Sequence, residues 1–423
     1  MIGIGPMPAG GTTAGRATRS RLTERHVLAL GLALSGLFVA AAAASAGAAL
    51  LAGGSAWSAI HLALAGAATV AIGTFMPHFS VTLAGTRPRQ PVDRITALAL
   101  LALGSTAAVA GVLAIGGWLA GLGSLAMLLG LGLVARQTFA PLADPLARRH
   151  HVVAVTYGAA LVMLSLGIAI GGLGAIGLPP IVGAWAQLRP AHAWLGLFGA
   201  VSLTIFATLV YLAPTVLGAR IRPSLALIAG AAGLLAGPPL AAIGFALGSA
   251  ATVVVGMTVT LIGAAGQLGY LADVVRRRGP FTSEHDWRRV AWVHFVAGAG
   301  WYAAALVAGL GGVLAGDPVR GWSIGALAVP VVAGWMLQEL IGSWTHLVPA
   351  VTPGTAADHA RQRRNLAVAS RSRLAAFNIG VGITWAGVWL DAGIAIGIGA
   401  SLVGVVGALS LTLLVRALAV ARY

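Results

Sequence analysis

About twelve long apolar runs dominate this sequence, and they constrain its fold more than any other feature. Most of them hold about 20 residues or more, which at a rise of 1.5 Å per residue is enough to cross the hydrocarbon core of a bilayer. The sequence therefore predicts an all-α, polytopic integral membrane protein with about 12 transmembrane helices. The expected spans are residues 27–52, 57–85, 95–118, 121–140, 151–176, 191–217, 224–246, 248–272, 289–314, 323–349, 374–390 and 392–417.

The composition supports a membrane protein and excludes several kinds of site. Hydrophobic residues make up 58% of the 423 residues and charged residues only 9%, whereas a soluble domain carries about 25% charged residues. The chain has no cysteine, which excludes disulfides, iron–sulfur clusters and thiolate-bound copper within it. We expect residues 1–26 to form a disordered, basic cytoplasmic tail and residues 27–418 to form a single twelve-helix membrane domain.

The arginines predict the orientation of the chain. All 26 basic residues are arginine, and their clusters follow the even-numbered spans, whereas the odd-to-even loops carry almost no charge beyond Arg189 and the nearby Asp317 and Arg320. Because basic residues accumulate in cytoplasmic loops, we expect both termini of this chain to lie in the cytoplasm. The chain would then be a multi-pass protein of the inner (cytoplasmic) membrane of a bacterial cell. Topology and attraction to anionic membrane lipids thus explain the net charge of +16, and no nucleic-acid partner is expected.

The second, sixth and tenth runs share a layout. His61 opens the second run and His192 opens the sixth, at an offset of 131 along the chain (192 − 61 = 131). Tyr211 near the end of the sixth run and His346 near the end of the tenth have a similar offset (346 − 211 = 135). A fixed long period is typical of repeated architecture. We therefore predict three four-helix repeats, each with a histidine-bearing helix as its second member.

His61 and His192 are the first candidates for cofactor binding and for metal ligation. They open equivalent helices at the same depth on the outer side, and a histidine inside a membrane usually faces a partner or a cavity. Neutral imidazole is also the commonest protein ligand for haem iron, copper and zinc. If the repeats surround a pseudo-threefold axis, the two rings can face one copper ion or one haem b. Otherwise they are unrelated interfacial histidines bonded to water and headgroups, and both interpretations remain open.

A second set of candidates lies toward the inner side. His78 and His346 close equivalent helices, and His294 starts the ninth span, so these three could form a second cofactor-binding cluster. Glu339 is the only carboxylate well inside a span, and His346 follows it at position i+7 on the same helix face. An intramembrane carboxylate indicates a proton relay or a partner for histidine or arginine. The alternative is a structural hydrogen bond to a neighbouring helix.

This layout resembles haem–copper oxidase subunit I, which has twelve spans in three four-helix repeats and histidines on the second, sixth and tenth spans. The segment AHAWLGLFGAVSLTIFATLVYLAPTVL, residues 191–217, also resembles divergent relatives of that superfamily, including NnrS-type membrane haem proteins linked to nitrogen-oxide metabolism. The similarity in layout covers nearly the whole chain. It implies that His61 falls on a haem-ligand helix, His192 on a copper-ligand helix and His346 on the other haem-ligand helix.

The chain departs from that family at the oxygen-reducing centre. Residues 223–247 hold no adjacent histidine pair, the tenth span has one histidine where the family has two, and no lysine exists for the proton channel. The resemblance therefore implies a scaffold for haem b or copper without a complete oxygen-reducing centre. We expect a membrane redox protein in electron transfer or nitrogen-oxide handling, with quinol or a redox partner protein as its partner. Whether it is itself an oxidoreductase stays open.

Two other classes of function also remain open. A transporter or channel with a path lined by Glu339 and the histidines would share the internal repeats. The repeats of a transporter usually form two inverted halves. In this chain each repeat of four spans ends on the side of the membrane where it began, so all three repeats would have the same orientation. A non-catalytic assembly subunit without cofactors is the other alternative. The visible absorption spectrum of the purified protein separates these classes.

Overall fold

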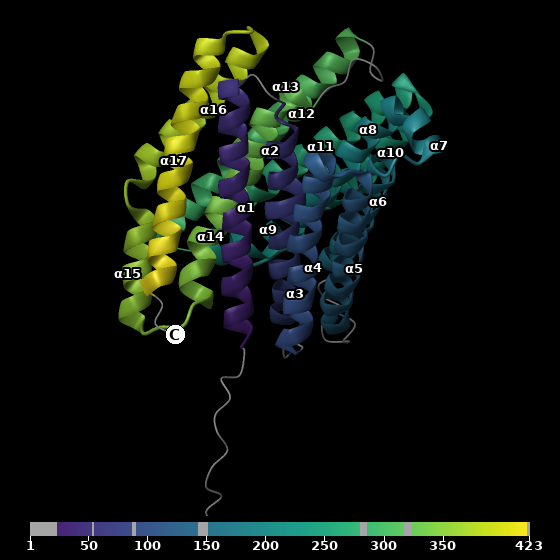
Figure 1. Ribbon diagram of the computed structural model, residues 1–423. Coiled ribbons are helices and arrows are strands. Elements are labelled where there is room, and N and C mark those ends of the chain that lie inside the picture. Colours follow the sequence, from purple (N-terminus) through teal and green to yellow (C-terminus); the bar gives the residue numbers. More distant parts are fainter. Residues whose placement is uncertain are drawn as a thin grey trace, which may run out of the picture.

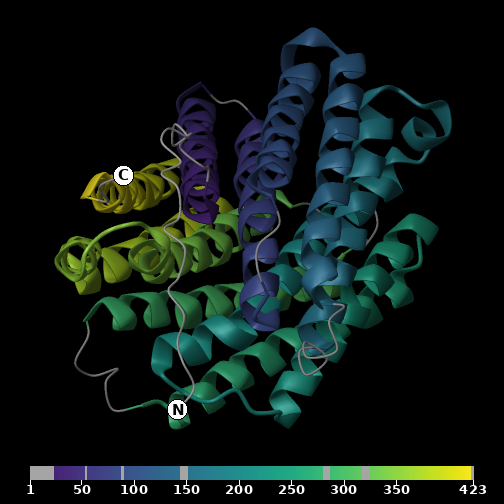
Figure 2. The ribbon, with the colours of Figure 1, turned by 90° about the horizontal axis from the view of Figure 1, so that it is seen from below.

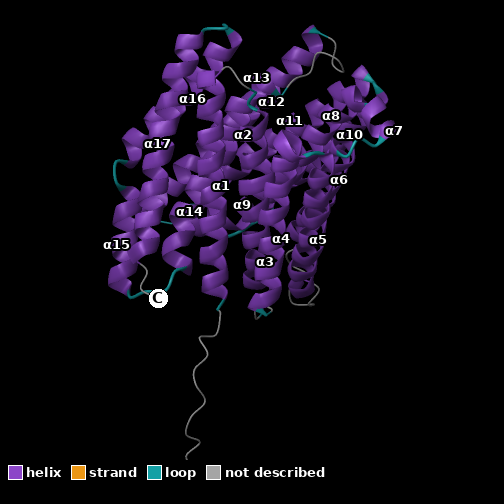
Figure 3. Cartoon of the chain, viewed as in Figure 1, coloured by secondary structure: helices purple, strands orange, loops and turns teal. Residues whose placement is uncertain are grey.

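A computed structural model describes residues 23–52, 55–86, 90–142, 151–279, 286–316 and 324–420. These residues form helices joined by short loops and contain no strand (Figures 1 and 3). Eleven of the described helices are long and apolar enough to cross a membrane. The prediction of an all-α chain with many helices of membrane-spanning length is therefore confirmed for the described residues. The predicted tail, residues 1–26, lies almost entirely outside the described residues.

The eleven helices follow the predicted apolar runs closely. Several of them contain a π-helical segment, denoted η. Their bounds are α1 (Glu24–Ala52), α2–η1–α3 (Trp57–Ala84), α4–η2 (Pro91–Ile115), α5 (Gly117–Leu142), α6 (His151–Ala175), α8–η4–α9 (Trp185–Leu217), α10 (Leu225–Leu247), α11 (Ala250–Arg276), α12 (Asp286–Ala315), α13–η6–α14 (Gly325–Val351) and α17 (Gly393–Val420).

Three further helices complete the described part of the chain: α7 (Pro179–Gly183), α15 (Ala356–Ala367) and α16 (Ser370–Trp389). The helix α16 occupies the expected span 374–390, but it is less apolar than the other eleven. Its first turn carries Arg371 and Arg373, and Asn378 lies in its middle. No apolar run predicts α15, whose sequence is rich in arginine and which begins with a capping box between Thr355 and Asp358.

Tight helical hairpins connect several neighbouring spans. The helices α10 and α11 pack so closely that a Cβ on Gly233 would lie 2.5 Å from the backbone of Gly263. Small residues permit this approach inside a membrane, where van der Waals packing drives helix association. Gly248, with φ of 67°, lies at the turn between α10 and α11. The turn before α5 lies at Gly116, whose φ of 125° suits only glycine, shortly before the expected boundary between the spans 95–118 and 121–140.

The first and last spans are neighbours. The helices α1 and α17 contact each other, and both views show α17 (yellow) beside α1 (purple) (Figures 1 and 2). The helix α1 begins, and α17 ends, at the lower end of the bundle in Figure 1. The bundle is thus closed by a contact between the two segments that lie farthest apart in the described sequence, which brings both ends of the described chain to one side.

The histidine-bearing spans share a local distortion. Each changes from α-helix to π-helix in its first half: η1 (Leu62–Ala68), η4 (Trp194–Val201) and η6 (Val329–Leu337). Each then returns to α-helix in α3, α9 and α14, and a proline follows at Pro77, Pro214 or Pro349. π-helical turns are rare and occur frequently at functional sites.

Arginine contacts tie the helices together at the lower end. Arg94, only 2% exposed, donates to Glu24 Oε1 at 2.6 Å and to the carbonyl oxygen of Thr74 at 2.7 Å, which joins α4 to α1 and α3. Arg288 at the start of α12 donates to the carbonyl oxygens of Thr215 and Val216 near the end of α9. A cation at a helix C-terminus stabilises carbonyl groups that have no partner within the helix.

Candidate functional site

The structure brings His61 and His192 together. Their ring centroids are 6.3 Å apart and the ring planes differ by 10°. His61 is the last residue of α2, directly before η1, and His192 lies near the end of α8, shortly before η4. Both side chains are half-buried. The pairing anticipated from the repeat offset is therefore present in the fold, at the end of the bundle opposite the arginine contacts.

Backbone carbonyl groups hold both imidazoles in the same tautomer. His61 Nδ1 lies 2.8 Å from the carbonyl oxygen of Trp57, and His192 Nδ1 lies 2.7 Å from the carbonyl oxygen of Gly167 on α6. A carbonyl oxygen only accepts hydrogen bonds, so each Nδ1 carries the proton and each Nε2 keeps its lone pair. Histidines that ligate metals are held in this way, with the second ring nitrogen donating to a backbone carbonyl or a carboxylate.

Two further residues shape the pair. The Trp57 ring stacks on His61 with centroids 4.0 Å apart. On the other side, a Cβ on Gly171 would lie only 2.9 Å from Cε1 of His192, so glycine is required there for close packing. One turn beyond His192, a Cβ on Gly196 would meet nothing within 4 Å.

The separation of the ring centroids is close to that of two imidazoles whose Nε2 atoms point at one metal between them. Two metal–nitrogen bonds of about 2 Å, plus about 1.2 Å from each nitrogen to its ring centroid, give roughly 6.4 Å for a metal between two opposed imidazoles. The observed value is 6.3 Å. Within the described ranges no three His, Cys, Asp or Glu side chains gather to hold a metal. The pair therefore suits a group that takes two protein ligands, such as haem iron with two axial imidazoles or two-coordinate copper.

The geometry leads to a prediction for Gly171. Replacing it with valine should push the His192 ring away from His61 and lower cofactor affinity by about 10–100-fold, as loss of a supporting contact does in known metal sites. Equilibrium titration of the purified variant with haem and with copper measures this effect. Gly132→Val is the matched control, because a Cβ there meets nothing within 4 Å. Equal affinities in the two variants would show that ring placement does not control binding.

The inner candidates, in contrast, lie in three separate environments. His78 Nδ1 is 3.4 Å from Glu24 Oε1, beside the Arg94 contact. His294 on α12 is bonded through Nδ1 to Gln338 Oε1 at 3.2 Å. Gln338 in turn interacts with Asn378 on α16. The structure thus assigns local partners to His78 and His294 and does not bring them together.

His346 has a different set of neighbours. Its ring stacks on Trp287 of α12, with centroids 5.0 Å apart and planes 13° from parallel. The guanidinium carbons of Arg288 and Arg363 lie 5.2 and 5.0 Å from the Trp287 ring centroid, within cation–π range. Trp287 and His294 are two turns apart on α12, so the His346 contact lies about 10 Å along the helix axis from the His294–Gln338 bond.

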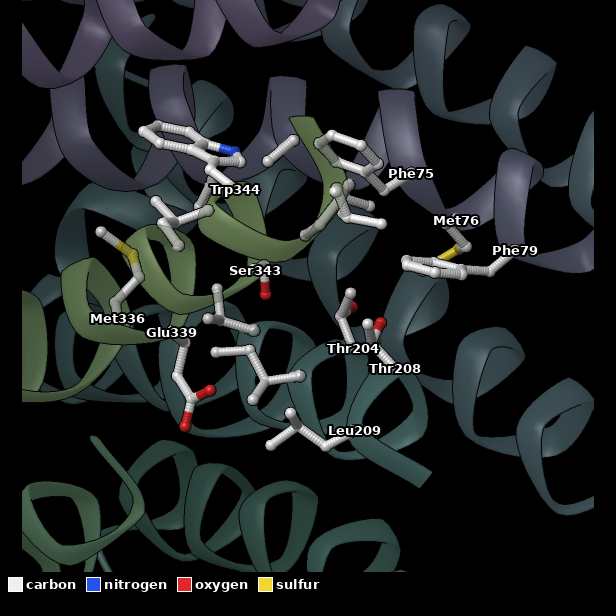
Figure 4. A pocket seen from close by; sticks show the side chains of 17 residues that line it. Phe75, Met76, Phe79, Thr204, Thr208, Leu209, Met336, Glu339, Ser343 and Trp344 are labelled. Carbon is white, nitrogen blue, oxygen red and sulfur yellow. The ribbon is translucent and has the colours of Figure 1, made fainter. Parts of the chain in front are cut away.

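Glu339 lines a cavity where the three histidine-bearing spans meet. The cavity lies between α3, α9 and α14 and has a volume of about 80 Å³. Figure 4 shows Phe75, Phe79, Thr204, Thr208 and Ser343 around it. Glu339 is 3% exposed, and neither carboxylate oxygen has a hydrogen-bond partner among the described residues. The sequence analysis left open a histidine or arginine partner for Glu339, and the described part of the chain provides none.

Several residues of these sites were not identified from the sequence. Trp57 precedes His61 by one helical turn, and this i, i+4 spacing is a recognisable signal for a stacked pair on one helix face. The carbonyl group of Gly167 and the side chain of Asn378 come from distant helices, and no local pattern indicates them. Comparison with known proteins adds no assignment, since no protein-family model and no curated protein matches this sequence.

Proposed function

We propose that this chain is a membrane redox protein that binds haem b or copper through His61 and His192. The observation that carries the proposal is the facing pair itself: two imidazoles 6.3 Å apart, each with Nδ1 bonded to a backbone carbonyl group. Haem with two axial imidazoles would supply one-electron transfer, and copper with two imidazoles would keep open positions for a small molecule such as nitric oxide. Trp57, Gly167 and Gly171 orient the rings.

The proposal includes a scaffold of three four-helix repeats that resembles haem–copper oxidase subunit I and NnrS-type proteins. The π-helical segments support it, because their first residues, Leu62, Trp194 and Val329, follow one another at nearly equal offsets (194 − 62 = 132; 329 − 194 = 135). The chain folds back to the same level of the bundle at these intervals. In this scheme α16 crosses the membrane as the eleventh of twelve spans, with Asn378 turned toward the bundle.

The proposed orientation places the arginine-rich end in the cytoplasm. The contacts of Arg94 and Arg288 lie at that end, together with the start of α1. His61 and His192 then lie near the outer face of a bacterial inner membrane, with lipids around the bundle. A quinol within the membrane or a redox partner protein would exchange electrons with this site. The function is electron transfer or nitrogen-oxide handling.

The transporter alternative is favoured by one observation, the cavity that holds Glu339. An unpaired intramembrane carboxylate is a common element of ion and proton pathways. The cavity and the histidine pair lie at different levels along the same spans. Transport would proceed without any colour or bound metal, so the experiment on the histidine pair separates the two functions.

The direct test is a spectrum of the protein purified in detergent from cells supplied with a haem precursor and copper. We expect either haem absorption bands that sharpen on reduction with dithionite, or a stoichiometric copper content without haem. A low-spin spectrum would identify two strong axial ligands, as two imidazoles supply. If circular dichroism shows folded protein that contains neither haem nor copper, the result would contradict the proposal and favour the transporter or the assembly subunit.

A further inference from the structure

The cavity between α3, α9 and α14 contains a carboxyl group that the histidine site does not use. Each of the three histidine-bearing spans contributes one wall, through Phe75 and Met76, Thr204 and Thr208, and Glu339 and Ser343 (Figure 4). At a rise of 1.5 Å per residue, His61 and Ala71 on the cavity wall are separated by about 15 Å along the helix. The cavity is therefore a site distinct from the histidine pair.

Glu339 is buried in a way that a charged carboxylate does not tolerate without compensation. It is 3% exposed, and both oxygens lack a hydrogen-bond donor among the described residues. On α12 it faces Gly298, where a Cβ would lie 3.0 Å from Oε1. Glycine has no side chain to bond to the carboxyl group, and both carboxylate oxygens are fully buried. Isolated buried carboxylates take up a proton, because the ionised form loses its solvation.

The charged and titratable groups on the surrounding helices do not neutralise Glu339. His78 on α3 and Arg94 on α4 are both held by Glu24. His294 on α12 is bonded to Gln338, and Arg373 on α16 donates to the carbonyl oxygens of Leu366 and Val368. Tyr157 on α6 pairs with Thr208, and His346 on α14 stacks on Trp287. Other charged or titratable groups on these helices include Tyr211 on α9, Arg288, Arg289 and Tyr302 on α12, and Arg371 on α16. Within the described part of the chain, none of them forms a hydrogen bond with Glu339.

The cavity is large enough to hold water, and a few hydroxyl groups interrupt its largely apolar wall. Its volume of about 80 Å³ exceeds the 10–15 Å³ or so that one water molecule requires. Thr204 Oγ1 donates to the carbonyl oxygen of Ala200, and Thr208 Oγ1 shares a hydrogen bond with Tyr157, so both hydroxyl oxygens retain acceptor capacity. Ser343 adds a third hydroxyl group to the wall. Water with two or more such partners is stable in a protein interior.

We propose that Glu339 and this cavity form a reversible proton-binding site, in which the carboxyl group exchanges its proton with water between the three histidine-bearing spans. The ligand is a proton rather than a metal ion, because within the described ranges Glu339 has no second or third carboxylate or imidazole with which to share a metal. The walls are otherwise apolar, which favours the neutral form of the acid. The site does not depend on cofactor binding at His61 and His192.

Infrared difference spectroscopy of the full-length protein in lipid tests this proposal. The wild type should show the carbonyl stretch of a protonated carboxylic acid at neutral pH, and the band should shift after transfer to D₂O. Glu339→Gln should lose the band, whereas Glu24→Gln should keep it, since Glu24 is paired with Arg94. A wild-type band that is absent, unchanged in D₂O or retained in Glu339→Gln would overturn the proposal.

A chemical measurement on the wild type avoids any dependence on the folding of the variants. Dicyclohexylcarbodiimide partitions into lipid and reacts with protonated carboxyl groups. We expect the adduct on Glu339 and not on Glu24, as located by mass spectrometry of the digested protein. An unmodified Glu339 peptide, or equal modification of both residues, would contradict a protonated site. Both measurements are read without reference to haem or copper, so they succeed or fail independently of the proposed redox function.

Discussion

Alanine in place of either His61 or His192 is expected to abolish stoichiometric cofactor binding. Each substitution removes one of two ligands, so the loss of affinity should exceed the roughly 10–100-fold that substitution of a supporting residue costs. The surrounding helices still bury their apolar surfaces in lipid and against one another, so the protein should remain inserted and helical. Haem absorbance and metal content per chain, measured beside circular dichroism, give the result.

Two matched variants sharpen this experiment. His359→Ala removes a histidine whose Nε2 contacts the carbonyl oxygen of Thr352 at the opposite end of the bundle, and it should leave the cofactor content unchanged. His61→Gly leaves space for free imidazole, and added imidazole should restore part of the binding. If the cofactor persists after loss of both His61 and His192, the ligands lie elsewhere. The residues to replace next would then be His78, His294 and His346.

The second large effect is expected on stability, at the contact between Glu24 and Arg94. Arg94 is 2% exposed and Glu24 about one-fifth exposed, with a distance of 2.6 Å between Nη1 and Oε1. Glu24→Gln leaves a buried guanidinium group without its counter-charge, which costs about 3–5 kcal/mol in comparable pairs. Unfolding in increasing sodium dodecyl sulfate, followed by circular dichroism, measures the change.

The neighbouring pair of Asp93 and Arg136 provides the control. The distance between Arg136 Nη2 and Asp93 Oδ2 is 2.7 Å, but the two side chains are 40% (Asp93) and 51% (Arg136) exposed. An exposed pair contributes about 0–1 kcal/mol, so Asp93→Asn should have little effect. The double variant Glu24→Gln with Arg94→Met should recover stability relative to Glu24→Gln alone, because no buried charge remains. Equal destabilisation by Glu24→Gln and Asp93→Asn would show that burial of Arg94 is not the source of the effect.

The sequence predicted the membrane helices well because apolar length is a local property. Eleven of the expected spans appear among the described helices with shifts of a few residues. The shifts have local causes. For example, α8 begins at Trp185 and continues through Arg189 and Pro190, since the helix extends beyond the apolar run into the polar boundary. The helix α16 differs because it carries Arg371, Arg373 and Asn378 among its apolar residues, and Asn378 accepts a hydrogen bond from Trp301 of α12.

For the candidate sites, too, the sequence indicates some features, whereas tertiary contacts determine the others. The offset between His61 and His192 predicted a shared depth but left open whether the two rings meet, and the structure brings them together. The same reasoning grouped His78 with His346, which the structure places with separate partners. Equivalence fixes the depth of a residue but not the direction of its side chain. Glu24 on α1 and Trp287 on α12 determine those directions through tertiary contacts, which no local pattern around His78 or His346 indicates.

The π-helical segments of the three central spans have a consequence for the angular register of these helices. Each residue advances an α-helix by about 100°, so a wide turn with one additional residue rotates everything beyond it by about that amount. The histidine pair lies before η1 and η4, whereas the cavity wall begins where η1, η4 and η6 end. The π-helical turn therefore determines the angle between the helix face that carries an imidazole and the helix face that lines the cavity on the same span. Side chains before and after this turn can thus point to two different sites while the backbone of the span stays hydrogen-bonded throughout.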